Sequence, residues 1–186
     1  MMKNLQEKKG FTIIETLVAI SVLLIALAGP LTIAAKGLYS SYYSRDEVTA
    51  FYLAQEGIEY FRNMRDTNYL SGQTWDNHFS DCIGKCRVDV TNNNPSNSGV
   101  TSCSSDNAHL PGLTCNRLNI DVNNIYDYTA TAGATTTNFT REITVQAIPN
   151  GSNPTVEYQI TSTVYWVSPL PNHSITLSED LTKWEN

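Results

Sequence analysis

The sequence predicts an α+β protein, in which a long N-terminal helix with a membrane half and an amphipathic half packs on an antiparallel β-sheet. Three observations predict this fold. An apolar run extends from Phe11 to Ala35, a helical repeat of apolar residues continues to about Arg65, and short alternating segments fill the remaining chain. Since no helices separate those segments, we expect an antiparallel sheet with the helix on one face.

The apolar run from Phe11 to Ala35 is 25 residues long, and Glu15 is its only charged residue. At about 1.5 Å per residue such a helix measures about 37 Å, enough to cross a hydrocarbon layer about 30 Å thick. The preceding residues carry a net positive charge, from Lys3, Lys8 and Lys9 against Glu7. By the positive-inside rule, residues 1–10 should stay in the cytoplasm and the remaining chain should be translocated.

Glu15 lies inside this apolar run and needs an explanation of its own. A carboxylate within a bilayer costs roughly 2.5–3.5 kcal/mol, and such residues usually have a partner. A signal anchor could tolerate one acid near its cytoplasmic end, where the side chain can reach the interface. The acid is not isolated, however, because two lysines and a glycine precede the run and Phe11 opens it.

The prepilin leader of type IV pilins and of type II secretion pseudopilins resembles the segment Lys9-Gly10-Phe11-Thr12-Ile13-Ile14-Glu15. The resemblance implies that a membrane prepilin peptidase cleaves between Gly10 and Phe11 and then methylates the new amino group of Phe11. It also implies that Glu15 pairs with the N-terminal amine of a neighbouring subunit as helices bundle into a filament. An acid and an amine, each costly in lipid, compensate one another only when the subunits are in register.

An ordinary secretory signal would end in a small-residue cleavage site, and none follows the apolar run at the expected place. Within the run, Pro30 removes a backbone hydrogen bond, so we expect a kink there, with a helix end at Ala28 as the alternative. Pilins commonly show a curved or locally melted helix at about this place. The small residues that would let neighbouring helices approach closely are Ala26, Gly29, Ala34 and Ala35.

A second helical stretch follows the apolar run. Ser44 and Glu47 have the spacing of a capping box, which predicts a helix start. The predicted stripe that packs on the sheet consists of Val48, Phe51, Ala54, Ile58, Phe61 and Met64. Residues 54–59 also resemble the corresponding part of minor pilins and minor pseudopilins. An aromatic cluster, interpreted as an interfacial belt followed by packing residues, comprises Tyr39, Tyr42, Tyr43, Tyr52 and Tyr60.

Alternating residues predict the strands. Apolar residues alternate with polar ones at 143–147 and at 156–166, and a dense turn signal at 149–154 joins these segments into a hairpin. Ile175 and Leu177 predict a third strand, before a C-terminal tail anchored by Leu181 and Trp184. Weaker alternation occurs at 88–90 and at 118–122. The runs at 91–107 and 129–137 are interpreted as polar loops that would carry any partner-specific surface.

The four cysteines are Cys82, Cys86, Cys103 and Cys115. The charge rule places them outside the cytoplasm, so disulfides that tie down the polar loop are the first expectation. Four cysteines allow three connectivities, and the sequence does not choose among them. Zinc is the rival interpretation, but the spacing lacks the usual paired close ligands.

The sequence offers little support for catalysis, a cofactor or a metal. The three histidines, which we expect on the surface, stand in separate polar stretches without a nucleophile motif: His78, His109 and His173. Asp121, Asn123 and Asp127 lack the glycine and glutamate of a calcium loop.

The net charge also bears on partners. It is −6, and loss of the leader's net +2 would leave −8 on the mature chain, which disfavours general binding to nucleic acid. Lys85 and Arg87 form the only local basic spot in the predicted β-rich domain and leave DNA uptake as an outside possibility.

We therefore expect four segments: a cytoplasmic leader (1–10), a transmembrane and filament-core helix (11–35), an amphipathic helix (36–66) and an extracytoplasmic β-rich domain (67–186). The expected function is a non-enzymatic, minor structural subunit of a type IV pilus-like filament. Its expected partners are prepilin peptidase, other pilin subunits, the inner-membrane assembly machinery and, before assembly, membrane lipid. A type II secretion pseudopilin is the alternative within the family. A single-span anchored adhesin or binding protein that never polymerises is the alternative from another class.

Overall fold

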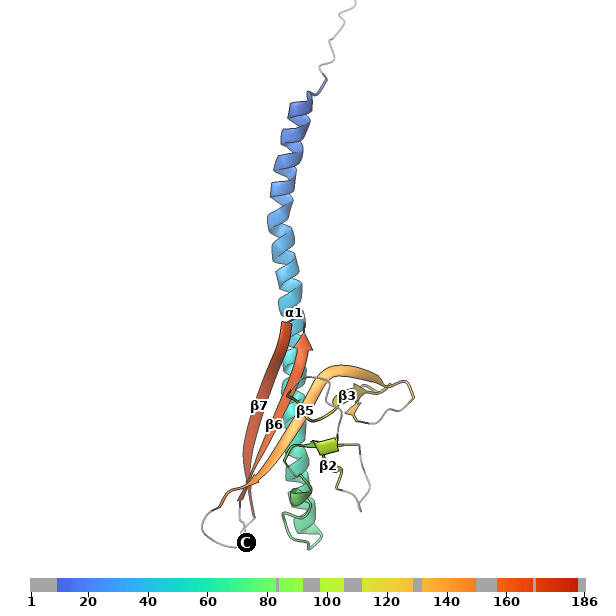
Figure 1. Ribbon diagram of the computed structural model, residues 1–186, viewed down its shortest axis with the longest axis vertical. Coiled ribbons are helices and arrows are strands. Elements are labelled where there is room, and N and C mark those ends of the chain that lie inside the picture. The colour runs from blue at the N-terminus through green and yellow to red at the C-terminus, as the bar shows by residue number, and fades with distance from the viewer. Residues whose placement is uncertain are drawn as a thin grey trace, which may run out of the picture. The chain divides into compact units, whose positions relative to one another are not determined.

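The computed structural model describes residues 10–82, 84–91, 98–105, 112–128, 132–149, 157–168 and 170–183. It shows the predicted α+β architecture, with one long helix and an antiparallel sheet (Figure 1). The helix is α1 (Ile13–Leu70), and two 3₁₀ turns are η1 (Phe79–Asp81) and η2 (Cys103–Ser105). The strands are β1 (Cys86–Val88), β2 (Val100–Ser102), β3 (Arg117–Ile120), β4 (Tyr126–Asp127), β5 (Thr135–Ala147), β6 (Glu157–Ser168) and β7 (Leu170–Thr182). The chain forms two compact units, Met1–Tyr43 and Ser44–Asn186, which are described separately.

Strand β5 is the centre of the sheet. It pairs with β6 from Phe139↔Trp166 to Ala147↔Tyr158, and with the shorter strands β1 and β3. Strands β2 and β4 extend the sheet beyond β1 and β3. Strand β7 pairs with β6, and within the described residues it pairs with nothing else, so it forms an edge of the sheet (Figure 1).

The three long strands confirm the main sequence prediction, with differences at their ends. On β6 the predicted alternation is present, since Ile160, Ser162, Val164 and Trp166 are buried. Leu181, expected in a tail, is a buried residue of β7. The hairpin turn from Asn150 onward, Val156 and Trp184 lie outside the described residues.

On β5 the predicted alternation is only partly correct. All five residues from Phe139 to Ile143 are buried, whereas Ala147 is exposed. The reason is that this stretch is covered on both faces. Arg141 and Ile143 lie against α1, while Glu142 contacts the segment around Thr114 on the other side.

The weaker predictions need correction. The run at 91–107, interpreted as a loop, contains strand β2, and the run at 129–137 includes the start of β5. Val90 and Val122 lie beyond the ends of β1 and β3. Short strands of this kind are specified by pairing with neighbours rather than by their own alternation, and so their own residues predict them poorly.

The helix also differs from its prediction. It is continuous from Ile13 to Leu70, so Ser44 lies inside it and caps nothing, and the end lies beyond Arg65. The helix neither ends at Ala28 nor is interrupted at Pro30. A proline removes a single helical hydrogen bond, and the turns on either side stay intact here.

The packing stripe of α1 is shifted from the predicted one. Buried positions of the helix are Ala50, Leu53, Ala54, Gly57, Ile58, Phe61 and Asn68. Phe51 is 36% exposed and Val48 is 55% exposed, so their assignment to the stripe was wrong. At Gly57 the helix lies too close to the sheet for a larger side chain. A Cβ built on Gly57 would lie 2.7 Å from Ser162 Oγ and 3.0 Å from Ile143 Cδ1.

A buried arginine joins three elements of the C-terminal unit. Arg141 of β5 is fully buried and donates hydrogen bonds to the Glu56 carboxylate (2.6 Å) and the Leu53 carbonyl (3.0 Å) of α1. It also donates to the Val88 carbonyl of β1 (2.9 Å). A buried charge is tolerated when it is paired and hydrogen-bonded, and here both terminal nitrogens of the guanidinium have acceptors, while Nε has none among the described residues.

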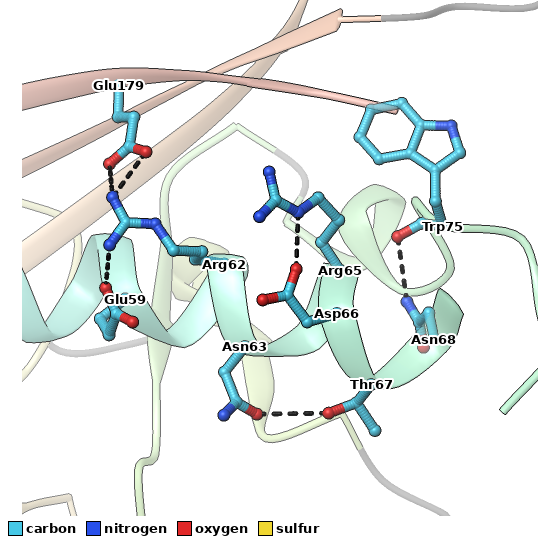
Figure 2. A network of polar contacts seen from close by, with 9 residues as sticks. All are labelled: Glu59, Arg62, Asn63, Arg65, Asp66, Thr67, Asn68, Trp75 and Glu179. Atoms are coloured by element: carbon cyan, nitrogen blue, oxygen red, sulfur yellow. Dashed lines mark hydrogen bonds and ion pairs between the residues drawn. The ribbon is translucent and has the colours of Figure 1, made fainter. Parts of the chain in front are cut away.

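Two more contacts fasten the last turns of α1 (Figure 2). Arg62 forms ion pairs with Glu59 on the helix and with Glu179 on β7. The buried Asn68 side chain donates to the Trp75 carbonyl (3.3 Å), which fixes the chain where it leaves the helix. Beneath this turn, the rings of Phe61, Phe79 and Trp75 meet edge to face.

Candidate processing junction and assembly helix

The candidate site begins at Gly10 and Phe11, immediately before α1 starts at Ile13. A Cβ built on Gly10 meets no heavy atom within 4 Å, and Phe11 is 80% exposed. The fold of the described chain therefore places no demand for glycine at position 10. The lysines of the leader and Glu7 lie outside the described residues.

Thr12 caps the start of α1. Its carbonyl accepts from the backbone N–H groups of Glu15 (3.1 Å) and Thr16 (3.2 Å), and its Oγ1 accepts from the Glu15 N–H (3.3 Å). Thr12 was not among the predicted caps, although Thr12 and Glu15 have the Thr-x-x-Glu spacing of a capping box. The cap orders the first helical turn, on which Glu15 stands.

Glu15 is exposed in the first turn of α1. Acidic residues are favoured in the first turn of a helix by the helix dipole, and Glu15 occupies that turn. Within the part of the chain that the structure describes, no side chain forms an ion pair or hydrogen bond with this carboxylate. The acid is thus available to a group from outside the described chain.

The following turns of α1 present an uncovered apolar surface. The large exposed apolar residues between Ile13 and Leu38 are Ile13, Ile14, Leu17, Val18, Ile20, Val22, Leu23, Leu24, Ile25, Leu27, Leu31, Ile33 and Leu38. By length and composition, α1 can cross a membrane, and its most apolar window is not buried by described residues. An uncovered apolar surface of this extent is stable only in lipid or against other apolar helices.

The hydroxyl groups of this span are satisfied within the helix. Thr16 donates to the Ile13 carbonyl, Ser21 to the Leu17 carbonyl, and Thr32 to the Ala28 carbonyl, each at 2.8 Å. These bonds remove the cost of exposing hydroxyl groups to hydrocarbon. Glu15 is the one residue of the 11–35 span with a charged side chain, so its carboxylate is the polar group of this span that still needs a partner.

Comparison with known protein families identifies this site. The prokaryotic N-terminal methylation motif matches residues 6–29. The chain carries the signature of type IV pilins and pseudopilins. The matched segment includes Gly10, Phe11 and Glu15 and most of the apolar span. No curated protein and no solved structure matches this pilin-like chain.

The four cysteines form two disulfides, Cys82–Cys86 and Cys103–Cys115. This agrees with the preference for disulfides and selects one of the three connectivities. Each of the four sulfur atoms is bonded to its partner in one of the two disulfides, so none is free to bind zinc as a thiolate. Both bridges are buried, which makes them structural rather than reactive.

Glu142 connects the two disulfide-bonded segments, a role that sequence reasoning did not detect. Its side chain is only 3% exposed and accepts from Lys85 Nζ (2.5 Å), the Thr114 N–H (2.5 Å) and the Cys115 N–H (3.3 Å). Burial alone would raise the pKa of Glu142, but these donors outweigh it and hold the pKa below its ordinary value. The predicted basic spot is therefore partly neutralised, and the Arg87 guanidinium lies over the Tyr128 ring at 5.0 Å.

Among the residues that the structure describes, the other sequence candidates do not form a cluster that could hold a metal ion. His78 Nδ1 contacts Asp81 (2.8 Å), and His173 is partly buried against Trp166, with ring centroids 5.5 Å apart. The expectation of a surface residue was thus wrong for His173, and His109 lies outside the described residues. Asp121 accepts from backbone N–H groups of its own turn, chiefly that of Ile125 (2.8 Å), which lowers the Asp121 pKa.

Proposed function

We propose that this pilin-like protein is a structural, non-enzymatic subunit of a type IV pilus-like filament, inserted in the membrane by α1 before assembly. The observation that carries the proposal is the isolated Glu15 carboxylate on an uncovered apolar helix, four residues after the Gly10–Phe11 junction of the methylation motif. Once a peptidase releases the Phe11 amine, the amine of a neighbouring subunit can form an ion pair with the Glu15 carboxylate.

The proposal includes a processing order. Prepilin peptidase acts first at Gly10–Phe11, in the cytoplasmic membrane with the leader inside the cell. The subunit then leaves the membrane for the filament with the help of the inner-membrane assembly machinery. We further propose a minor rather than a major subunit, on the basis of the disulfide-tied segment and the likeness of residues 54–59 to minor pilins.

Glu15→Ala tests the pairing. The variant should insert and lose its leader at the wild-type rate, because both steps precede contact between subunits. It should then be depleted from sheared filaments, whereas Glu15→Asp should be intermediate because its shorter side chain reaches the amine less well. Quantitative mass spectrometry of the sheared and membrane fractions gives both measurements.

A matched control is Glu47→Gln, which removes an exposed acid of the same helix outside the apolar span. It should enter filaments like the wild type. Recovery of Glu15→Ala in filaments at the level of Glu47→Gln would exclude the pairing mechanism. An intact leader on all of the wild-type protein would favour the permanently anchored binding protein instead, and assembly only under a type II secretion system would favour the pseudopilin.

A further inference from the structure

Strand β7 has an unpaired edge. Its pairing with β6 keeps one register from Glu157↔Thr182 to Trp166↔His173, and no other described strand pairs with it. In an antiparallel strand, alternate residues direct their N–H and C=O groups to opposite sides. One set of these groups on β7 therefore points away from the sheet and can accept another strand.

The middle of this edge lacks the features that usually protect edge strands. Sheets commonly block an edge with a charge, a proline or a bulge. On β7 the irregular register and Pro171 lie before His173, and the acids Glu179 and Asp180 lie near the other end. The stretch from Ser174 to Ser178 contains none of them.

A groove runs beside the open edge, between β7 and α1. It encloses about 590 Å³, and its apolar lining includes Phe51, Tyr52, Ile58 and Leu177. Phe51 and Tyr52 are 36% and 64% exposed, so the groove has uncovered aromatic surface that an occupant could bury. A strand added to β7 would direct every second side chain to the groove side of the sheet.

The rim of the groove is acidic. Arg62 forms ion pairs with both Glu59 and Glu179 (Figure 2). Asp180 accepts a hydrogen bond from Gln159 Nε2 (3.2 Å) and has no ion pair with any described residue. Glu59 and Glu179 thus share a single guanidinium, and Asp180, whose side chain lies on the opposite face of β7 from Glu179, adds negative charge at the same end of the strand. This end of the edge therefore favours a positively charged occupant.

We propose that β7 binds an extended segment of another polypeptide by strand addition. The segment alternates apolar side chains, which enter the groove, with polar ones, and it carries at least one lysine or arginine beside Glu179 and Asp180. A second copy of this chain fits less well, because its own β7, from Leu170 to Thr182, contains no lysine or arginine to place beside Glu179 and Asp180 in either orientation. This docking is independent of the proposed assembly through Glu15, since it uses only the C-terminal unit.

The test uses the full-length protein in detergent micelles. The probe is a fluorescein-labelled seven-residue peptide that alternates valine with threonine and ends in two lysines, and the control peptide ends in two glutamates. We expect saturable binding of the lysine peptide, at least about fivefold tighter than the glutamate peptide at low salt. Hydrogen exchange should show new protection at β7 and not at β3 or β4.

Ser178→Lys supplies the variant, because Ser178 is exposed and lines the groove. It should weaken binding of the lysine peptide about fivefold or more by placing a like charge on the edge. Asn138→Lys adds the same charge at an exposed position on β5 and should change binding less than about twofold. Circular dichroism verifies that both variants are folded.

Three outcomes would overturn the proposal: equal binding of both peptides, equal loss in both variants, or protection away from β7. Self-association of the free protein with protection of β7 would also overturn it, in favour of a second copy as the occupant. Failure of Glu15→Ala to behave as expected would leave this result unchanged, because the peptide is bound by unassembled protein.

Discussion

Glu142 illustrates how much one buried carboxylate can hold together. It accepts hydrogen bonds from Lys85, Thr114 and Cys115, and so links the segments that carry the two disulfides to the central strand β5. Because its pKa is lowered by folding, the stabilisation is complete above the ordinary glutamate pKa of about 4.3. It is lost as the pH falls through the lower pKa of the folded state.

Glu142→Gln should therefore act differently at neutral and acidic pH. At pH 7 we expect a loss of about 1–3 kcal/mol in the free energy of unfolding, since charged hydrogen bonds to a buried group are removed. Below about pH 4 the difference from wild type should shrink, because the wild-type carboxylate becomes protonated. Urea unfolding followed by tryptophan fluorescence measures both values. The same change at exposed Glu47 is the control, and wild-type stability of Glu142→Gln at pH 7 would contradict this role.

The residues found from sequence and those missed differ in physical kind. Gly10, Phe11 and Glu15 belong to a local motif, so their spacing alone identifies them as candidates. Arg141 and Glu142 act through partners distant in the chain, and no local pattern distinguishes them from surface charges on an exposed strand. Only the three-dimensional arrangement shows that they are buried.

The sequence predicted some helices and strands better than others. Strands β5, β6 and β7 are long, so their alternation was readable, whereas β2 is three residues in a polar run and was missed. The cap predicted at Ser44 was wrong because the helix is already propagating there, and continuing a helix costs less than starting one. The predicted stripe was correct at Ala54, Ile58 and Phe61, but it included the exposed Val48 and Phe51 and omitted the small residues Ala50 and Gly57, which lie on the contact.

Gly57→Ala tests this close contact between helix and sheet. Alanine gains about 1 kcal/mol over glycine in a helix, but overpacking a core costs about 1–3 kcal/mol. With Ser162 Oγ 2.7 Å from the new methyl group, we expect a net loss of about 1 kcal/mol in the free energy of unfolding.

Ser162→Ala is the matched partner variant. The Ser162 hydroxyl is buried and has no hydrogen-bond partner among the described residues, so its removal alone should be close to neutral. In the double variant it should restore part of the loss, because it removes the atom nearest the new methyl group. A double-mutant cycle in urea measures this coupling, and strict additivity would contradict the proposed clash.

At the scale of the whole molecule, the two units need different surroundings. The C-terminal unit closes its own core with α1, the sheet and two disulfides. The N-terminal unit leaves its apolar helix uncovered and depends on lipid or on neighbouring helices. Under the proposed function, a subunit moves from lipid into contact with neighbouring helices, and we propose that cleavage at Gly10–Phe11 triggers this move by creating an amine that can pair with Glu15.

Gly10→Leu tests that trigger. Because a Cβ at Gly10 meets nothing in the fold, the variant should insert and fold like the wild type. Cleavage should nevertheless be abolished, and Gly10→Ala should be cut poorly, if the peptidase must approach the backbone closely. Co-expression with a prepilin peptidase should shorten wild type by the ten residues of the leader, and N-terminal sequencing should find methylated Phe11.

Gly37→Leu is the matched control for that experiment. Gly37 is another glycine of the N-terminal unit whose Cβ position is open, but it lies outside the matched motif. Its leader should be removed at the wild-type rate, which separates an effect on the junction from a general effect of added bulk. Efficient cleavage of Gly10→Leu would show that Gly10–Phe11 is not the processing site. The Phe11 amine would then not arise, and Glu15 would need another partner in the membrane.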